Sequence, residues 1–374
     1  MDLLEIRGRL DQIDTQIEKL FEERMRLCSE VAEYKIATGK AVYDAEREKQ
    51  KIESVQAMAE GEFNKQAVAE LFLQMMTLSR RYQYQTIAGR VGGPDLGFHK
   101  VEKLETAGKR VVFQGLEGAY GHAAALQFFG KDADIHHVRR FEDMMVEIQE
   151  GKADFAVLPI ENSSAGAVTD NYDLLLKYDN VIVAETFLPV HHYLLGTPDA
   201  ELSDVKRVFA HPQALMQCSA FLNDNGLKQI SVENTAVAAK RVVEEGDKSQ
   251  AAIASEIAGK LYGLELLKPF IQNNQGNTTR FVILANRKVY QKDAGKISLC
   301  FELPHTSGSL YNMLGNFIFN HVNMMMIESR PIPGKNWEYR FFVDIEGNLQ
   351  DAGVKNALRG IGAEAQNFKI LGNY

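Results

Sequence analysis

Apolar residues in the first ninety positions recur in steps that alternate between three and four, which is the spacing of one face of a helix. Residues 2–90 contain no proline, and Gly39 stands where a first helix would end. We predict this helix, a second over about 44–60 and a third over about 64–87. The seam of the first helix consists of Ile6, Leu10, Ile13, Ile17, Leu20, Leu27, Val31 and Tyr34.

The predicted helices differ greatly in length. At ~1.5 Å per residue the first would be roughly 50 Å long, and three helices of such unequal length do not bury that seam by themselves. We therefore expect an all-α domain over residues 1–90 that pairs with a second copy of the chain. The expected assembly is an intertwined homodimer or a higher homo-oligomer.

The pattern changes after the glycine-rich segment GRVGGPDLGFHK (89–100), which carries the first proline. It predicts a linker over residues 91–107. Beyond it, short apolar runs alternate with helical stretches, which indicates an α/β domain over residues 108–287. The predicted strands are VVFQG (111–115), FAVLPI (155–160), VIVAE (181–185), VFAH (208–211), AAIAS (251–255) and RFVILA (280–285).

Residues 295–374 follow the order strand, helix, strand, strand, helix, strand. This βαββαβ order is that of the ferredoxin-like α+β fold. We expect the Met324–Met326 run in the core of its strand and Trp337 in packing. The chain is thus predicted to be a multidomain protein.

Composition narrows the class of partner. The chain has 374 residues, of which 45% are hydrophobic and 25% charged, as in soluble globular proteins of two or three domains. The net charge of −8 argues against nucleic acid as the main partner. No apolar run reaches the ~20 residues of a membrane span, and the acidic, amphipathic start is unlike a secretory signal. The three widely spaced cysteines, Cys28, Cys218 and Cys300, fit a reducing cytoplasm and form no metal-ligand pattern.

Arg24 interrupts the apolar seam where the spacing requires an apolar residue. An arginine turned inward is destabilising unless an anion pairs with it. At ~100° per residue, Lys35 lies about 20° away around the helix, on the same face, whereas Arg7 lies about 100° off it. Arg7 would serve such a pocket more easily from the partner chain. The other two helices add polar side chains: Asp44, Arg47, Glu48, Ser79 and Gln83.

Two interpretations of these charges are open. Most helical charges are solvated surface groups in i,i+4 pairs, whereas Arg24 on the seam favours an inner pocket for a small dianion. The segments LLEIRGRLDQID, EERMRL, VAEYK, YDAEREK and LSRRYQ resemble the all-helical chorismate mutases. The resemblance implies that chorismate's two carboxylates are bound by Arg7 of the neighbouring subunit, Arg24 and Arg47. It implies that Lys35 and Gln83 face the ether oxygen, and that the hydroxyl group and neighbouring atoms are held by Asp44, Glu48 and Ser79.

Such a site suits a Claisen rearrangement. The reaction needs no nucleophile and no proton shuttle, because the site selects a folded conformer and stabilises the negative charge that grows on the ether oxygen. Cations and amide donors are sufficient for that, and no cofactor is expected.

Polar residues also stand at strand ends in the α/β region, where open sheets bind ligands. NTTRF (277–281) by itself is no more than a β-edge pattern. GAYGHAA adds glycines and a helix start after a strand, which suits anion binding by backbone amides. Together the segments GLEGAYGHAA, LPIENSSAGAV, HPQAL, ASEIAGKLYGL and NTTRF resemble prephenate dehydratase. The resemblance implies two α/β lobes around a cleft, as in periplasmic binding proteins, with a second lobe at about 190–270.

The resemblance also implies the chemistry of this region. Prephenate loses water and carbon dioxide to give phenylpyruvate, and Thr279 is the essential donor to the departing hydroxyl group. Substrate contacts are expected from Asn162, Ser163, Asn277 and Thr278. Glu161 is either a general acid or a helix-start carboxylate. Arg280 either anchors a carboxylate or braces its loop, with bracing slightly favoured. Gly121 departs from the family, which usually has serine there.

The C-terminal segment SGSLYNML…ESRP resembles the ACT regulatory domain of prephenate dehydratases. The resemblance implies that phenylalanine binds at a dimer interface. Glycine permits close backbone approach and a helix start offers amides to a carboxylate. The expected effector contacts are Gly308, Ser309, Leu310, Glu328 and Ser329.

The three resemblances predict one bifunctional enzyme of phenylalanine biosynthesis. It would convert chorismate to prephenate and prephenate to phenylpyruvate, with allosteric feedback inhibition by phenylalanine. Two alternatives stay open. One is an amino-acid sensor whose catalytic domains are degenerate. The other is a mutase whose dehydratase is impaired at Gly121.

Overall fold

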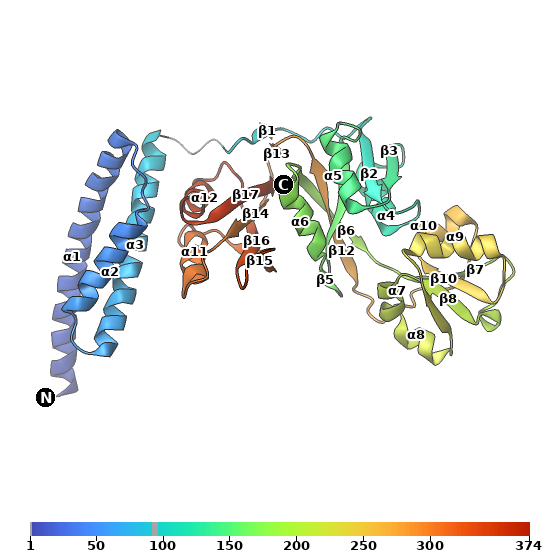
Figure 1. Ribbon diagram of the computed structural model, residues 1–374, viewed down its shortest axis with the longest axis horizontal. Coiled ribbons are helices and arrows are strands. Elements are labelled where there is room, and N and C mark those ends of the chain that lie inside the picture. The colour runs from blue at the N-terminus through green and yellow to red at the C-terminus, as the bar shows by residue number, and fades with distance from the viewer. Residues whose placement is uncertain (1, 92–95) are drawn as a thin grey trace. The chain divides into compact units, whose positions relative to one another are not determined.

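The chain divides into two compact units in a computed structural model that describes residues 2–91 and 96–374. The first unit comprises residues 1–96 and 300–368, and the second comprises residues 97–299 and 369–374. Both units thus contain residues that are remote in sequence. Figure 1 shows the N-terminal helices in blue and the C-terminal elements in red.

The three predicted helices are present at the start of the chain (Figure 1): α1 (Leu3–Thr38), α2 (Ala45–Met58) and α3 (Glu62–Val91). Helix α1 ends at Gly39, which adopts the left-handed conformation with φ of 69° and donates its N–H to the carbonyl oxygen of Lys35. Helix α2 begins at Asp44, whose carboxylate accepts a 3.0 Å hydrogen bond from the backbone N–H of Arg47.

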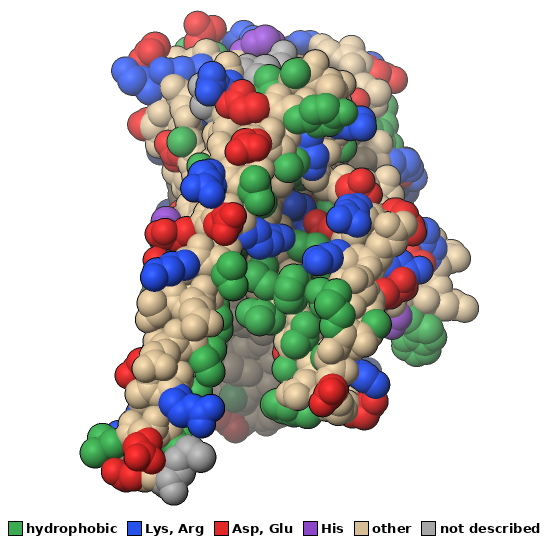
Figure 2. Space-filling model, turned by 90° about the vertical axis from the view of Figure 1, so that its left-hand side faces the viewer, with side chains coloured by type: hydrophobic (Ala, Val, Ile, Leu, Met, Phe, Trp, Pro, Cys, Tyr) green, Lys and Arg blue, Asp and Glu red, His purple; other side chains and the backbone are tan. Residues whose placement is uncertain are grey.

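The apolar seam of α1 is exposed in the single chain. Its eight residues, from Ile6 to Tyr34, are between 39% and 66% exposed, and Ala32 is the only fully buried residue of α1. Figure 2 shows hydrophobic side chains gathered on the face of the helical region. Because apolar surface of this extent is unfavourable in water, the helical region has a face that another surface would cover.

The rest of the first unit contains α11 (Ser309–Ile318), β15 (Met324–Pro331), β16 (Tyr339–Glu346) and α12 (Ala352–Glu364). Strands β14 (Lys296–Glu302) and β17 (Gln366–Asn373) precede and follow them, and their residues are divided between the units. The order of elements is the predicted one. Strands β15 and β16 pair antiparallel, with Glu328 opposite Phe342, and helices α3 and α12 lie against each other.

Two packing predictions in this region were wrong. Alternate residues of β15 are exposed, so that Met324 and Met326 are half-buried but Met325 is 49% exposed. Trp337 is 75% exposed, because it lies in the loop between β15 and β16 with φ of 65°. Apolar composition alone did not distinguish these positions from core.

The second unit holds the predicted α/β domain, and its first lobe is a mixed sheet with the strand order β6-β12-β4-β2-β3. Strands β2, β3 and β4 run parallel, and β12 lies antiparallel between β4 and β6. The elements are β2 (Arg110–Gln114), α4 (Tyr120–Phe129), β3 (Asp134–Val138), α5 (Phe141–Gln149), β4 (Phe155–Asn162), β5 (Gly166–Ala167), α6 (Thr169–Lys177), β6 (Val181–Pro189) and β12 (Thr278–Ala285). Phe113, Phe155 and Ile283 are among its buried core residues.

The second lobe is inserted between β6 and β12, as the prediction of a lobe at about 190–270 requires. Its sheet has the order β11-β7-β10-β8-β9. The elements are β7 (Tyr193–Gly196), η1 (Leu202–Asp204), β8 (Arg207–Ala210), α7 (Pro212–Gln217), α8 (Ser219–Asp224), β9 (Lys228–Ser231), α9 (Thr235–Glu245), β10 (Gln250–Ala254), α10 (Glu256–Tyr262) and β11 (Glu265–Lys268). The chain therefore crosses between the lobes immediately before and after this insertion.

The predicted linker over residues 91–107 falls partly on residues 92–95, which lie outside the described residues. Within the rest of it, β1 (His99–Val101) pairs in parallel with β13 (Val289–Gln291). The glycine-rich composition did not predict this strand.

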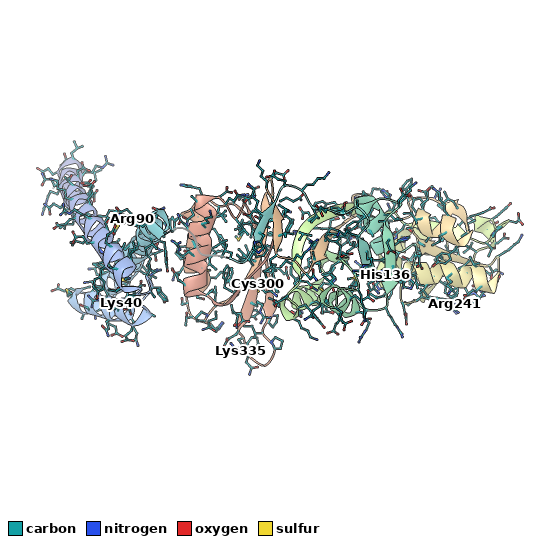
Figure 3. All side chains as sticks on the ribbon, turned by 90° about the horizontal axis from the view of Figure 1, so that it is seen from above. Lys40, Arg90, His136, Arg241, Cys300 and Lys335 are labelled. Atoms are coloured by element: carbon teal, nitrogen blue, oxygen red, sulfur yellow. The ribbon has the colours of Figure 1, made fainter. Side chains whose placement is uncertain are left out.

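Within the described ranges, no helix has the length and apolar character needed to cross a membrane. Among those same residues no group of three or more His, Cys, Asp or Glu side chains could hold a metal ion. Cys218 is buried, as is Cys300 on β14, which Figure 3 labels, and Cys28 is half-buried.

Gly118 joins the two lobes at the loop before α4. Its φ is +90°, and a Cβ atom there would lie 2.9 Å from the Cα of Ala258 on α10. Its carbonyl oxygen accepts a 2.7 Å hydrogen bond from the Ser255 hydroxyl group at the start of α10. Only glycine satisfies both the backbone conformation and this close approach.

We predict that Gly118→Ala lowers the free energy of unfolding more than Gly130→Ala does. Gly130 has nearly the same φ, +89°, but no heavy atom lies within 4 Å of the position that a Cβ atom would take there. The control substitution should cost about 1–3 kcal/mol from backbone strain alone, because Gly130 has φ of 89° and ψ of 169°, and Gly118→Ala about 1–3 kcal/mol more from overpacking. Urea unfolding followed by circular dichroism measures both, and equal losses of stability would contradict the argument.

Candidate active sites

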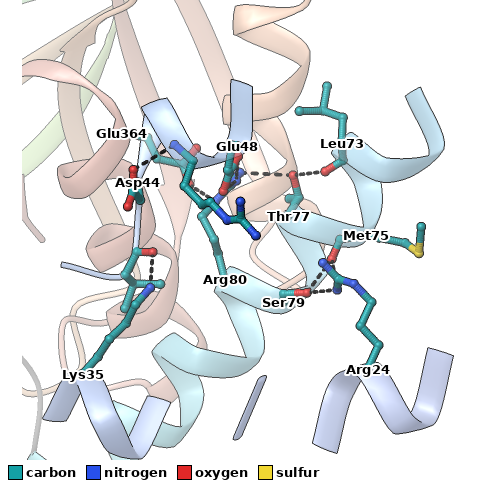
Figure 4. Close-up of polar contacts among 12 residues, drawn as sticks. Arg24, Lys35, Asp44, Glu48, Leu73, Met75, Thr77, Ser79, Arg80 and Glu364 are labelled. Atoms are coloured by element: carbon teal, nitrogen blue, oxygen red, sulfur yellow. Dashed lines mark hydrogen bonds and ion pairs between the residues drawn. The ribbon is translucent and has the colours of Figure 1, made fainter. Parts of the chain in front are cut away.

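Arg24 turns from α1 towards α3 rather than into water (Figure 4). Its Nη1 donates to the carbonyl oxygen of Met75 at 3.1 Å and to the hydroxyl oxygen of Ser79. The arginine is half-buried and Ser79 is 4% exposed. Both partners are neutral, so these contacts orient the guanidinium group without cancelling its charge.

Lys35 also turns inward from α1. Its Nζ donates a 2.7 Å hydrogen bond to the carbonyl oxygen of Val42, in the segment that leads to α2. Burial lowers the pKa of Lys35, although the carboxylates of Asp44 and Glu48 act in the opposite direction. A lysine held in this way loses its proton more readily than an exposed lysine.

Arg80 on α3 is a member of this site that sequence reasoning missed. Its side chain is 6% exposed, and its Nη1 donates to both carboxylate oxygens of Glu48. Its Nε donates to Glu364 at 3.0 Å and its Nη2 to the Thr77 hydroxyl oxygen at 3.1 Å. Burial alone would lower the pKa of Arg80, but the two carboxylates outweigh it and raise the pKa. The only signal in the sequence was the arginine next to Ser79 in LSRRYQ.

The remaining predicted residues of the helical site are distributed differently. Gln83 is 6% exposed, and its Oε1 has no hydrogen-bond partner among the described residues. Asp44 and Arg47 are exposed at the start of α2. Arg7 is exposed too, and at ~1.5 Å per residue it lies about 25 Å along α1 from Arg24. A single chain therefore does not bring Arg7 to the other residues.

In the α/β region, Asn162 at the end of β4 connects the predicted polar residues. Its Nδ2 donates to the Thr279 hydroxyl oxygen at 2.9 Å and to Asn277 Oδ1 at 2.8 Å. Its Oδ1 accepts from the backbone N–H groups of Ser164 and Ala165, both at 3.0 Å. All four hydrogen-bonding positions of this amide are thus held by β12, by Asn277 just before it and by the turn after β4.

Thr279 is 9% exposed and lies opposite Asn162 in the register of β12 and β4. Because its oxygen accepts from Asn162, its own O–H group remains a donor, and no acceptor for that proton occurs in residues 2–91 and 96–374. Asn277 Nδ2 is also buried, and it has no hydrogen-bond partner among the residues that the structure describes. The site therefore presents unused donors beside an ordered network.

Ser163 ties the two strand ends together. Its hydroxyl oxygen accepts a 2.9 Å hydrogen bond from the backbone N–H of Thr278, and its own N–H donates to the carbonyl oxygen of Thr278 at 2.9 Å. Ser163 is exposed and Thr278 is half-buried. These two hydrogen bonds hold the segment NTTRF against the end of β4 and so fix the position of Thr279.

Arg280 is 8% exposed and is held by protein groups. Its Nε donates to Glu185 at 2.7 Å and its Nη2 to the Tyr374 hydroxyl oxygen at 2.7 Å. Glu161 lies 3.8 Å from Nη1, at the edge of an ion pair, and its side chain is 44% exposed. Arg280 therefore links β12 to β6 and to the last residue of the chain.

Gly121 lies in the first turn of α4, where the family pattern has serine. A Cβ atom there would be 3.4 Å from the carbonyl oxygen of Gln114, which is ordinary contact. The fold accommodates a Cβ atom at this position, so packing against Cβ does not impose the glycine.

The predicted effector residues lie on two elements of the C-terminal region. Gly308 has φ of 80° and precedes α11, which begins with Ser309 and Leu310. Glu328 and Ser329 lie on β15, the edge strand that pairs with β16; the first is half-buried and the second exposed.

Two protein families match this chain: chorismate mutase type II over residues 6–84 and prephenate dehydratase over residues 111–289. The chain is 31% identical to the bifunctional chorismate mutase/prephenate dehydratase of Enterobacter agglomerans, across 100% of this chain and 95% of the relative. It is 32% identical to the protein of that name from Aquifex aeolicus (strain VF5), across 100% and 98%. The solved structure of prephenate dehydratase in complex with L-Phe from Arthrobacter aurescens is 29% identical, with a TM-score of 0.66, and covers 71% of this chain and 89% of that one.

Proposed function

The chain belongs to the family of bifunctional chorismate mutase/prephenate dehydratases, and from this membership we propose how its residues perform the two reactions. The helical domain rearranges chorismate to prephenate. The α/β domain decarboxylates and dehydrates prephenate to phenylpyruvate, in the biosynthesis of phenylalanine. The observation that carries this function is similarity to both enzymes in one chain along its whole length. The free thiols of Cys28 and Cys218 agree with the cytoplasmic location that we propose.

For the first reaction we assign the carboxylates of chorismate to Arg24, Arg47 and Arg7 of a second copy. Lys35 and Gln83 face the ether oxygen and stabilise the negative charge that develops as its bond to carbon breaks. Asp44, Glu48 and Ser79 hold the hydroxyl group and neighbouring atoms. The donor to the ether oxygen would be Gln83 Nε2, and the buried Oε1 of the same amide, without a partner among the described residues, could accept from another ligand group.

The homodimer is part of the proposal. The exposed seam of α1 supports it, because burying apolar side chains stabilises association by about 25 cal/mol per Å² before the costs of association are subtracted. The position of Arg7, too far along α1 to reach Arg24 in the same chain, also supports it.

For the second reaction, we assign Thr279 as donor to the departing hydroxyl group of prephenate. The C–C bond to the ring carboxylate breaks, carbon dioxide leaves, and its electron pair enters the ring as the C–O bond breaks. The hydroxyl group departs as water with a proton that comes from solvent, while the Thr279 hydroxyl group hydrogen-bonds the leaving oxygen, and the product ring is aromatic. The network on Asn162 supports Thr279 in this role, because it leaves the threonine proton free to point at the leaving oxygen.

The neighbours of Thr279 have distinct proposed roles. Asn162, Ser163, Asn277 and Thr278 contact or position the substrate. Arg280 braces the strand, a role that its burial and its contacts with Glu185 and Tyr374 support. Glu161, at the open end of β4, supplies a carboxylate towards the substrate.

We further propose that residues 295–374 form an ACT domain that binds phenylalanine as feedback inhibitor. The strand and helix order supports this, as does the L-Phe named in the description of the Arthrobacter aurescens structure. The effector contacts would be Gly308, Ser309 and Leu310 at the start of α11, with Glu328 and Ser329 on β15. Exposed apolar side chains on these elements, Tyr311 and Ile327 among them, suit an interface between two copies.

We predict that Arg24→Ala abolishes conversion of chorismate to prephenate and leaves conversion of prephenate to phenylpyruvate at the wild-type rate. The substitution removes the inward cation but no residue of the dehydratase. Ultraviolet assays with each substrate measure the two rates, and Arg26→Ala, an exposed arginine on the same helix, is the matched control. Loss of both activities in a folded Arg24→Ala protein would contradict separate sites.

The converse prediction concerns Thr279→Ala, which should reduce the dehydratase rate by at least about a hundredfold, the lower range for a positioned proton donor. The mutase rate should not change. Thr169→Ala, in the same lobe and outside the polar network, is the control. A dehydratase rate near wild type would remove Thr279 from the mechanism.

A wild-type chain that makes no product from either substrate would instead favour the amino-acid sensor.

The pH dependence of the mutase should report Lys35. Its protonated form is the active one, and burial lowers its pKa. Therefore kcat/KM for chorismate should fall as the pH rises through that pKa, at a lower pH than an ordinary lysine would impose. Lys35→Arg keeps a cation that does not lose its proton and should abolish this alkaline limb. Lys19→Arg, on an exposed part of α1, should retain it, and an unchanged limb in Lys35→Arg would exclude Lys35 as its source.

A further inference from the structure

Helix α12 of the C-terminal region contributes a carboxylate to the charged cluster of the helical domain. Glu364, the last residue of α12, accepts a 3.0 Å hydrogen bond from Arg80 Nε, and its side chain is 12% exposed. On its other edge the same guanidinium group contacts both carboxylate oxygens of Glu48. Arg80 thus bridges a proposed substrate-binding carboxylate and a residue far along the chain (Figure 4).

Further contacts hold α12 and α11 against α3. Arg359 Nη1 donates to the carbonyl oxygen of Tyr84 at 3.0 Å. Arg81 Nη2 donates to the carbonyl oxygen of Phe319 at 3.2 Å, and its Cζ lies 3.5 Å from the centroid of the Phe319 ring. The position of Glu364 therefore does not depend on a single flexible side chain.

The geometry of Arg80 determines what Glu48 can still bind. A guanidinium group can bind one carboxylate through two of its nitrogen atoms, with two parallel N–H groups. Here Nε is engaged by Glu364 and Nη2 by Thr77, so only Nη1 contacts Glu48, where it reaches both carboxylate oxygens. A carboxylate has about four lone-pair positions, and Glu48 keeps some of them for a further donor.

We propose that Glu364 is a positioning residue of the chorismate mutase. By engaging Arg80 Nε it holds the guanidinium group in an orientation that leaves Glu48 able to accept the hydroxyl group of chorismate. The mutase site therefore includes a residue of the C-terminal region, outside the helical domain. This inference rests on the proposed function, because it presupposes that Glu48 contacts chorismate.

The proposal implies a dependence on pH. Glu364 is faced by Arg80 and Tyr84 of α3, by Glu48 of α2 and by Tyr43 just before α2, with Arg359 on its own helix near Tyr84. Burial raises the pKa of Glu364, although Arg80 opposes the shift. As the pH falls, Glu364 takes up a proton earlier than an ordinary glutamate and loses its hold on Arg80.

The test compares the full-length wild type, Glu364→Gln and Glu346→Gln. Glu346 is an exposed glutamate at the end of β16, so its substitution removes the same charge from the same region. We expect Glu364→Gln to lower kcat/KM for chorismate by about tenfold at neutral pH, the scale of one charge-assisted hydrogen bond. It should also lack the acid limb that the wild type and Glu346→Gln show. Dehydratase rates on prephenate in all three proteins should agree, which verifies the fold.

The outcomes separate the two levels of the argument. A wild-type protein that does not turn over chorismate overturns the proposed function. A second outcome is that the wild type is active and Glu364→Gln shows the same kcat/KM for chorismate at every pH. That result overturns the role of Glu364 and leaves the proposed function intact. If Glu364→Gln loses both activities, a second variant distinguishes a folding defect from a positioning role. This variant is Glu364→Asp, which keeps the negative charge. The proposal requires that it restore the dehydratase and retain the acid limb of the mutase, and equal loss of both rates rejects it.

Discussion

The removal of arginine guanidinium groups from water is the constraint on which both sites of this chain depend. A buried cation is tolerated only when oxygen atoms meet it. Arg80 is met by the carboxylates of Glu48 and Glu364, and Arg280 by Glu185 and the hydroxyl group of Tyr374. Each of these arginines consequently fastens together segments that are remote in sequence, and each lies next to a residue assigned to catalysis.

Arg24 obeys the same constraint in a different way. Its contacts are with the carbonyl oxygen of Met75 and the hydroxyl oxygen of Ser79, which are neutral. Its positive charge therefore remains for a ligand, whereas the charge of Arg80 is balanced by protein carboxylates. In the proposed assignment this difference in charge balance distinguishes Arg24, which would bind substrate, from Arg80, which is the more buried of the two.

Features set by residues close together in the sequence were predictable, and features set by contacts between remote residues were not. Helical and strand periods are local, so the three helices, the main strands and the inserted lobe were predictable. Arg24 was identified because it broke a local pattern. Arg80 and Glu364 were not, because their contact spans 284 positions and neither residue disturbs the periodicity around it. The prediction for Trp337 failed because it lies exposed in the loop between β15 and β16, and its apolar character does not reveal that position.

Residues of the C-terminal region contact Arg80 in the first unit and Arg280 in the second. Helix α12 supplies Glu364 to Arg80 in the first unit, and the residue after β17 supplies the Tyr374 hydroxyl group to Arg280 in the second. An effector changes a remote equilibrium only by the difference in its affinity for two states. If the proposed phenylalanine site favours a state in which α12 or the end of β17 is displaced, the hydrogen bonds that orient Glu48 and the strand of Thr279 would break. Feedback on either reaction would then need no direct contact between effector and substrate.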